Sequence, residues 1–177
     1  MKKTFQKPAR EIVVLAHNIR STHNVGAIFR TSEGFGISKI IFSGYTPFPT
    51  LPNEDFSRTQ RLPFIAEKLT KQIAKTALGA EDLAPFEVSH DIFETISELK
   101  LQGFTVVALE QNERSTPLKD FKSTEKIALL LGEEVHGITP QLIQKCDQIL
   151  EIPMFGHKES FNVSVAAGIA LYKIACE

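Results

Sequence analysis

The sequence predicts an α/β protein with a mostly parallel sheet and helices on both of its faces. Short runs of β-branched and apolar residues alternate along the chain with segments whose apolar residues recur at helical spacing. A strand, a helix and a second strand also fit within about 30 residues, the length of a βαβ unit, whose two strands are parallel. The chain is 42% hydrophobic and 23% charged, which is ordinary for a globular domain and excludes a disordered or fibrous protein.

The first part of the chain supplies this βαβ unit. Residues 11–16 and 39–43 are compact β-branched runs, and each predicts a buried strand. Between them, residues 24–35 place apolar side chains at helical spacing and are followed by glycine, which stops a helix. Residues 44–63 are rich in proline and predict a long loop, which at this length is more often functional than merely connecting.

The alternation continues to the end of the chain. Further helices are predicted at 67–77, 91–101 and 139–145, and further strands at 104–109, 127–131 and 148–152. The segment 110–122 is polar and predicts a loop. The last helix, residues 160–175, is apolar on nearly every side, so it must be covered within the domain or by another subunit.

Charge and cysteine content limit the class of protein further. The chain of 177 residues has 20 Lys and Arg against 21 Asp and Glu, a net charge of −1. This balance argues against a protein that coats nucleic acid by bulk electrostatics, but it allows a local basic patch. Two cysteines are too few for a disulfide framework and fit a reducing compartment. Without a signal-peptide apolar region or an apolar run of roughly 18 residues, we expect a cytoplasmic protein that does not enter a membrane.

In parallel sheets of this kind, ligands bind beyond the carboxyl ends of the strands. The loops expected at that edge are 16–23, 110–116, 132–139 and 153–159. Three of them adjoin segments in which polar residues are concentrated.

The first polar segment lies where the first strand leads into the first helix. It contains Asn24, Gly26 and Arg30, and the glycine allows another backbone to approach closely. An arginine near the start of that helix can reach a phosphate bound at its mouth. The alternative is a capped helix whose arginine is only solvated.

The second polar segment, Gly132–Gly137, follows the most apolar strand. Its two glycines flank Glu133 and Glu134, an arrangement that can present backbone amides and an acid to a ligand. An ordinary strand-to-helix turn with solvated acids explains it equally well. The segment matches neither the dinucleotide-binding G-x-G-x-x-G pattern nor a phosphate-binding G-K-[ST] loop.

The third polar segment opens the last helix with Ser160, Asn162 and Ser164. A helix start needs one capping residue, so three exceed what capping requires. An asparagine in an apolar first turn costs stability unless it bonds a partner. A ligand role and a structural role both remain open.

Other kinds of site find no support in the sequence. The five histidines show no metal-binding spacing, so no metal site is predicted. Ser32 and Ser43 lie in no G-x-S-x-G elbow, and Cys146 is predicted to be a small buried hydrophobe. The residues alone therefore predict a ligand-binding α/β domain with three polar segments at one edge of its sheet.

In this order and spacing, the three segments resemble the motifs of the SpoU-type (TrmH-like) RNA ribose 2′-O-methyltransferases of the SPOUT superfamily. The resemblance covers about residues 11 to 175. The chain departs from the family pattern at Phe161, where leucine is usual, and at Lys173, where an acidic residue is common. The matching positions are Asn24, Gly26 and Arg30 in N-x-G-x-x-x-R, then Gly132, Glu134 and Gly137 in G-x-E-x-x-G, and finally residues 160–166 in S-L-N-V-S-V-A.

The resemblance implies a specific fold and cofactor. Residues 1–177 would form a single methyltransferase domain without an added N-terminal RNA-binding domain, and its C-terminal third would be threaded into a deep trefoil knot. The family works as a homodimer, with catalytic residues from both subunits. S-adenosylmethionine would be the cofactor, bound at Leu109, Gly132, Ile152, Met154, Ser160 and Asn162.

The resemblance also implies the reaction, the transfer of a methyl group to a ribose 2′-hydroxyl of RNA. The catalytic set would be Arg30, Asn24, Glu134, Ser160 and Asn162. Arg30 would act as a base only if its pKa fell by many units, which is severe for a guanidinium. The milder hypothesis is that Arg30 clamps the adjacent phosphate and orients the hydroxyl.

Transfer RNA is the expected substrate, because small members of the family mostly modify it. The alternatives are a ribosomal RNA enzyme, a non-catalytic module that binds RNA or adenosylmethionine, and a nucleotide-dependent α/β enzyme of another class. The candidates for phosphate contact are Lys2, Lys3, Lys7, Arg10, Arg20, Arg58 and Arg61, although each can equally be solubilising charge.

Overall fold

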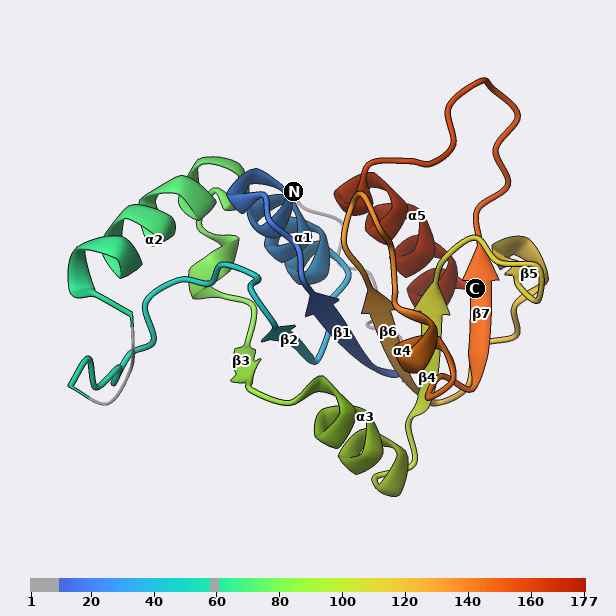
Figure 1. Cartoon of the computed structure of the whole chain (residues 1–177), viewed down its shortest axis with the longest axis horizontal. Helices are drawn as coiled ribbons and strands as arrows, with labels where there is room; N and C mark the ends of the chain where they lie inside the picture. The colour runs from blue at the N-terminus through green and yellow to red at the C-terminus, as the bar shows by residue number, and fades with distance from the viewer. Residues whose placement is uncertain (1–9, 58–60) are drawn as a thin grey trace, which may run out of the picture.

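The structure is organised around a seven-stranded sheet in which every described strand pair is parallel (Figure 1). It is a computed structural model that describes residues 10–57 and 61–177. The order across the sheet is β3-β2-β1-β6-β4-β7-β5. The strands are β1 (Glu11–His17), β2 (Lys39–Ser43), β3 (Phe86–Ser89), β4 (Thr105–Leu109), β5 (Thr116–Pro117), β6 (Lys126–Leu131) and β7 (Gln148–Glu151). The parallel sheet predicted from the sequence is confirmed.

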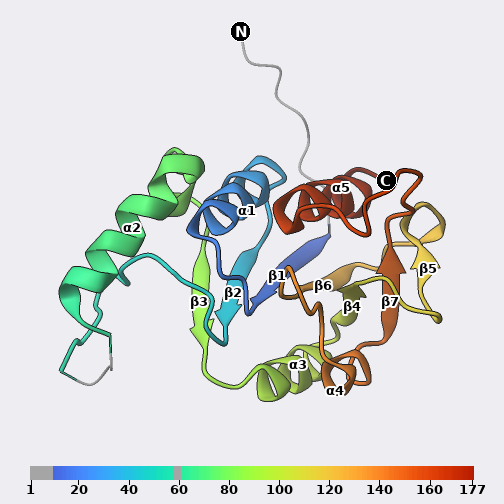
Figure 2. The same ribbon diagram turned by 45° about the horizontal axis from the view of Figure 1, so that its top comes forward.

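Helices lie on both faces of the sheet, as predicted (Figure 2). One face is covered by α1 and α5, with α2 packed against α1, and the other by α3 and α4. The helices are α1 (Thr22–Gly34), α2 (Pro63–Ala77), α3 (Ile92–Leu101), α4 (Pro140–Ile143) and α5 (Val163–Cys176), with short 3₁₀ turns at Ala80–Asp82 and Leu118–Asp120. Among the described residues, no helix is long and apolar enough to cross a membrane.

The interior strand β1, which lies between β2 and β6, shows why its sequence is a continuous apolar run. Side chains of a strand alternate between the two faces. Ile12, Val14 and Ala16 therefore join the core under α1 and α5, whereas Val13 and Leu15 join the core under α3 and α4. All five are buried, so neither face of this strand tolerates a polar residue.

Two strands and several helix ends differ from the prediction. β3 and β5 are short edge strands, and neither has an apolar run that distinguishes it from a loop. α2 begins at Pro63 rather than residue 67, because proline is well suited to the first helical turn. α1 begins earlier, at Thr22, since Ser21 caps it, and α4 ends early, at Ile143. α5 begins at Val163 rather than residue 160, because Asn162 is its N-cap.

Candidate active site

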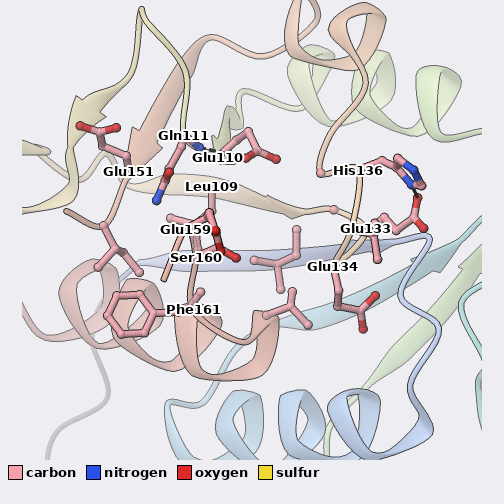
Figure 3. A pocket seen from close by; sticks show the side chains of 17 residues that line it. Leu109, Glu110, Gln111, Glu133, Glu134, His136, Glu151, Glu159, Ser160 and Phe161 are labelled. Atoms are coloured by element: carbon pink, nitrogen blue, oxygen red, sulfur yellow. Dashed lines mark hydrogen bonds and ion pairs between the residues drawn. The ribbon is translucent and has the colours of Figure 1, made fainter. Parts of the chain in front are cut away.

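A cavity of about 380 Å³ lies beyond the carboxyl ends of β4, β6 and β7 (Figure 3). These strands are parallel, so their carboxyl ends meet at one edge of the sheet. The loops predicted to hold a ligand after these three strands are therefore brought together. The cavity is lined by Leu109, Glu110 and Gln111 after β4, Leu131 to Gly137 after β6, Glu151 and Ile152 after β7, and Glu159, Ser160, Phe161, Val163 and Ala166 around the start of α5.

A chain of hydrogen bonds joins three of the predicted catalytic residues beside this cavity. The Nδ2 of Asn24, in the first turn of α1, donates to Oε1 of Glu134 at 2.9 Å. The Nδ2 of Asn162 in turn donates to Oδ1 of Asn24 at 3.1 Å. All three sequence motifs are thus connected by two side-chain hydrogen bonds.

The polar residues at the start of α5 divide two tasks between them. Asn162 caps the helix, because its Oδ1 accepts from the backbone N–H of Ser164 at 3.0 Å and from the Ser164 hydroxyl at 2.7 Å. Ser160 precedes the cap and lines the cavity (Figure 3). The apparent excess of capping residues is therefore one cap, its hydrogen-bond partner and one residue of the cavity wall.

Glu133 holds a second cluster at the rim of the cavity, which the sequence did not predict. Arg20 forms an ion pair with one of its carboxylate oxygens, and Nδ1 of His136 lies 3.2 Å from the other. Desolvation by itself would raise the pKa of Glu133, but hydrogen bonds from Arg20, His136 and Tyr45 outweigh it and lower that pKa overall. Glu133 is therefore an anionic anchor for Arg20 at neutral pH.

The predicted cofactor residues mostly line the cavity. Leu109, Gly132, Ile152 and Ser160 do so directly, and Asn162 is tied to its rim through Asn24. Met154 is half-buried in the loop after β7 and does not contribute to the lining.

Arg30 lies apart from the cavity in the third turn of α1. Its side chain is exposed, and within residues 10–57 and 61–177 it forms neither a hydrogen bond nor an ion pair. A single copy of the chain thus does not bring Arg30 together with Glu134 and Ser160.

Gly26 has the close backbone contact expected of it, but the contact is with α2. A side chain at this position would overlap the carbonyl oxygen of Ile73 and the hydroxyl of Thr76. The same Thr76 hydroxyl donates to the carbonyl of His23 at 2.9 Å. Gly26 therefore sets the distance between α1 and α2, and with it the position of Asn24.

Three of the basic residues proposed for phosphate contact are engaged within the protein, among them Arg20 in its ion pair with Glu133. Arg10 donates from Nη1 to the carbonyl of Ile174 at 2.9 Å and so helps to cap α5. The Arg61 guanidinium lies 4.1 Å from the ring centre of Phe48, and its Nε is 3.5 Å from Oε1 of Glu54. Burial lowers the pKa of Arg61. The other candidates, Lys2, Lys3, Lys7 and Arg58, lie outside the described residues.

Metal ligands and reactive thiols are the remaining possibilities to consider. In the part of the chain that the structure describes, no group of three or more His, Cys, Asp or Glu side chains is placed to hold a metal ion. Cys146 is half-buried, with its Sγ 3.3 Å from the carbonyl oxygen of Leu142, and burial raises its pKa to about 11. This environment disfavours the thiolate, so Cys146 behaves as a small apolar residue.

Comparison with known proteins identifies the family to which this site belongs. Residues 11–172 match the family model described as the SpoU rRNA Methylase family. The chain is therefore a member of that family, which includes RNA methyltransferases.

Proteins similar to this chain are named as RNA methyltransferases. The chain is 28% identical over 98% of its length to a Staphylococcus aureus protein assigned to the TrmH family of tRNA/rRNA methyltransferases, and it spans 62% of that protein. It is 25% identical to the tRNA (guanosine(18)-2′-O)-methyltransferase of Aquifex aeolicus, covering 98% of this chain and 72% of the relative.

Solved structures show the same fold. The A. aeolicus TrmH/SpoU tRNA modifying enzyme superimposes with a TM-score of 0.72 at 25% identity, over 94% of this chain and 76% of that one. An AdoMet-bound rRNA methyltransferase from Sinorhizobium meliloti gives a TM-score of 0.76 at 24% identity, over 96% of this chain and 56% of that one.

The hydrogen bond between Asn24 and Glu134 can be tested by exchanging its donor and acceptor. Asn24→Asp places a second carboxylate against Glu134, and we expect it to lower the free energy of unfolding by about 1 kcal/mol. Adding Glu134→Gln supplies a new donor, so the double variant should be more stable than the sum of the single changes predicts. Denaturant unfolding gives the stability of the parent protein, the two single variants and the double variant. Glu113→Gln removes the same charge as Glu134→Gln at an exposed site and is the control. Strict additivity would show that the two side chains do not interact.

The raised pKa of Cys146 predicts a slow thiol. With a pKa of about 11, about one Cys146 thiol in a thousand is ionised near pH 8, and this fraction rises about tenfold for each pH unit up to the pKa. In the folded protein, a thiol-reactive dye should therefore label Cys176, which is exposed, much faster than Cys146. Cys176→Ser and Cys146→Ser variants assign the two rates. Equal labelling rates in the two folded variants would contradict the burial of Cys146.

Proposed function

We propose that this chain transfers the methyl group of S-adenosylmethionine to a ribose 2′-hydroxyl of RNA, with transfer RNA as the substrate. The observation that carries the proposal is the cavity at the carboxyl edge of the sheet, which draws its walls and rim from all three motif segments. Membership of the SpoU family supports a methyltransferase reaction. The A. aeolicus relative, named for a 2′-O-methylation of tRNA, supports the ribose and the tRNA.

The cavity suits a small cofactor of this type. Its volume of about 380 Å³ falls within the range of about 300–1,000 Å³ that is typical of small-molecule sites. Backbone groups at Leu109, Gly132 and Ile152 can bind the polar edge of a nucleobase, and the carboxylates of Glu110 and Glu134 suit a ligand that carries positive charge. S-adenosylmethionine, when bound, supplies a methyl group activated by its sulfonium. The AdoMet-bound state of the S. meliloti structure agrees with this assignment.

The residues of the chain then have to position a poor nucleophile. We assign to Asn24, Glu134 and Asn162 the task of holding the start of α5 and the loop after β6 at a fixed separation. Ser160 faces the cavity and can hydrogen-bond the ribose (Figure 3). Arg30 clamps the phosphate next to the target ribose and orients the 2′-hydroxyl, because a guanidinium does not give up its proton at accessible pH.

A homodimer completes this arrangement. The face of α5 that carries Val165, Ile169 and Tyr172 is exposed, while its other face is buried under α1. These residues recur at helical spacing, so a second copy of the chain can cover them as one apolar stripe. Arg30 is exposed on the neighbouring helix and lies outside its own cavity, which favours its action at the partner's site.

Two further features belong to the proposal. The C-terminal segment is threaded as a trefoil knot, an idea supported by the position of β6 between β1 and β4 and by the return of α5 to pack on α1. The protein works in the cytoplasm, as its two free cysteines suggest.

Methyl transfer can be tested directly with labelled cofactor. The protein is incubated with methyl-labelled S-adenosylmethionine and separate pools of unmodified transfer and ribosomal RNA, and each RNA is digested to nucleosides. We expect a 2′-O-methylated nucleoside from transfer RNA. Label on a base, or in ribosomal RNA alone, would contradict the proposed reaction or the proposed substrate, and binding of cofactor and RNA without transfer would leave only a binding module.

Arg30 variants separate the clamp from the base. Arg30→Ala should lower kcat by about 100-fold to 1,000-fold, the usual effect of removing one preorganised donor. Arg30→Lys keeps the charge and should retain part of the activity with little change in its pH dependence, because a clamp does not titrate. A pH–rate profile displaced toward the pKa of lysine would instead identify residue 30 as the base.

The dimer has its own test at α5. Ile169→Glu places a charge in the exposed apolar stripe and should convert a particle of twice the chain mass into one of 19.7 kDa, as measured by light scattering after gel filtration. Leu101→Glu, at an 89% exposed residue on α3, is the matched control and should leave the dimer intact. A monomeric parent protein would refute the proposed assembly.

A further inference from the structure

A second cavity, of about 580 Å³, lies next to the first, where β1 and β2 end. It is lined mainly by Arg20, Ser21 and Thr22 at the start of α1 and by Gly44 to Phe48 after β2. Arg20 belongs to this cavity, whereas its ion-pair partner Glu133 belongs to the first. The two cavities therefore adjoin where Arg20 and Tyr45 contact Glu133.

The wall of the second cavity presents an aromatic ring beside a cation. The side chain of Tyr45 is 51% exposed, although its size and apolar ring would favour burial. The guanidinium of Arg20 lies 6.0 Å from the centre of that ring, and hydrogen bonds to Tyr45 and Glu133 raise the pKa of Arg20. Arg20 has five N–H donors, so contacts with Tyr45 and Glu133 leave donors for a ligand.

The backbone around Tyr45 is held in place by contacts that do not involve its ring. Asn18 and Gly44 both have left-handed backbones, with φ of 58° and 64°. The Oδ1 of Asn18 accepts from the N–H of Tyr45 at 3.2 Å. A side chain at Gly44 would overlap the side-chain amide of Asn18. The buried Thr46 hydroxyl accepts from the N–H of Ile19 at 3.0 Å and so joins the same two loops. Left-handed backbone at a non-glycine residue is unfavourable, and it is often kept where a loop serves a ligand.

We propose that Tyr45 and Arg20 bind one nucleotide of the RNA that flanks the methylated nucleotide, with its base stacked on the tyrosine ring and its phosphate on the guanidinium. Stacking on an aromatic ring is the common means by which proteins hold unpaired bases, and arginine pairs with phosphate through several N–H groups. The inference rests on the proposed function, because it is the position beside the first cavity that makes RNA the expected ligand. It adds a substrate contact that lies outside the three motifs.

Tyrosine fluorescence tests this site without any need for turnover. The chain has two tyrosines and no tryptophan, so Tyr172→Phe leaves Tyr45 as its only emitter. We expect a single-stranded oligoribonucleotide to quench this emission, since a stacked base contacts the ring. In the reciprocal Tyr45→Phe protein, Tyr172 should show no quenching. Quenching of equal size in both proteins, or none in the Tyr172→Phe protein when anisotropy of a labelled oligoribonucleotide shows binding, would refute the site.

Methylation kinetics provide the second measurement. Tyr45→Ala should raise KM for RNA by about 5-fold to 150-fold, the range found when a stacking ring is removed. Tyr45→Phe keeps the ring and loses only the hydroxyl that hydrogen-bonds Arg20 and Glu133, so it should raise KM less than Tyr45→Ala does. The affinity for S-adenosylmethionine should not change in either variant. Phe93→Ala removes a 40% exposed ring on α3, at the other face of the sheet, and is the matched control.

The two proposals fail in different ways. If RNA is methylated and Tyr45→Ala keeps the parent KM, the stacking site is wrong and the proposed function stands. If no RNA is methylated but oligoribonucleotide quenches Tyr45 emission selectively, the stacking site stands and the proposed reaction is wrong.

Discussion

An ionised carboxylate accepts hydrogen bonds but donates none, and this constraint sets the direction of the bonds on which the site depends. Because Glu134 can only accept, Asn24 must offer its Nδ2, which leaves its Oδ1 free to accept from Asn162. Asn162 then has its own Oδ1 left to cap α5. One carboxylate thus orients two amides and a helix start, although Glu134 and Asn162 lie 110 and 138 residues from Asn24 in the sequence.

This arrangement exists only because the sheet is parallel. In a parallel sheet, every strand delivers its following loop to the same edge, so segments from distant parts of the chain meet without a dedicated connection. The loops after β1 and β2 form the second cavity, and those after β4, β6 and β7 form the first. The cavities proposed for cofactor and for RNA therefore lie along one edge of the sheet.

The sequence predicted the features that depend on local pattern. The buried run of β1, the helical spacing of α1 and the surplus of polar residues before α5 each have a physical cause within a few residues, and each proved informative. β3 and β5 escaped prediction, because a short edge strand has no apolar run of its own.

Contacts between residues that are distant along the chain could not be predicted from the sequence. Nothing near Arg20 identifies Glu133 as its partner, and nothing near Arg10 identifies the carbonyl of Ile174. Asn18 and Gly44, two residue types that tolerate the left-handed backbone they adopt here, are the local signals that could have drawn attention to the loop that supports Tyr45.

The contact of Gly26 with α2 affects how loss-of-function variants of this chain should be interpreted. Any side chain at Gly26 would push α1 away from Ile73 and Thr76, and Asn24 would move with it. A genetic screen scored only by activity would then assign Gly26 and Thr76 to the active site, although neither lines its cavity. The residues that such a screen identifies as essential would therefore include residues of α1 and α2 that hold Asn24 in place without contacting a ligand.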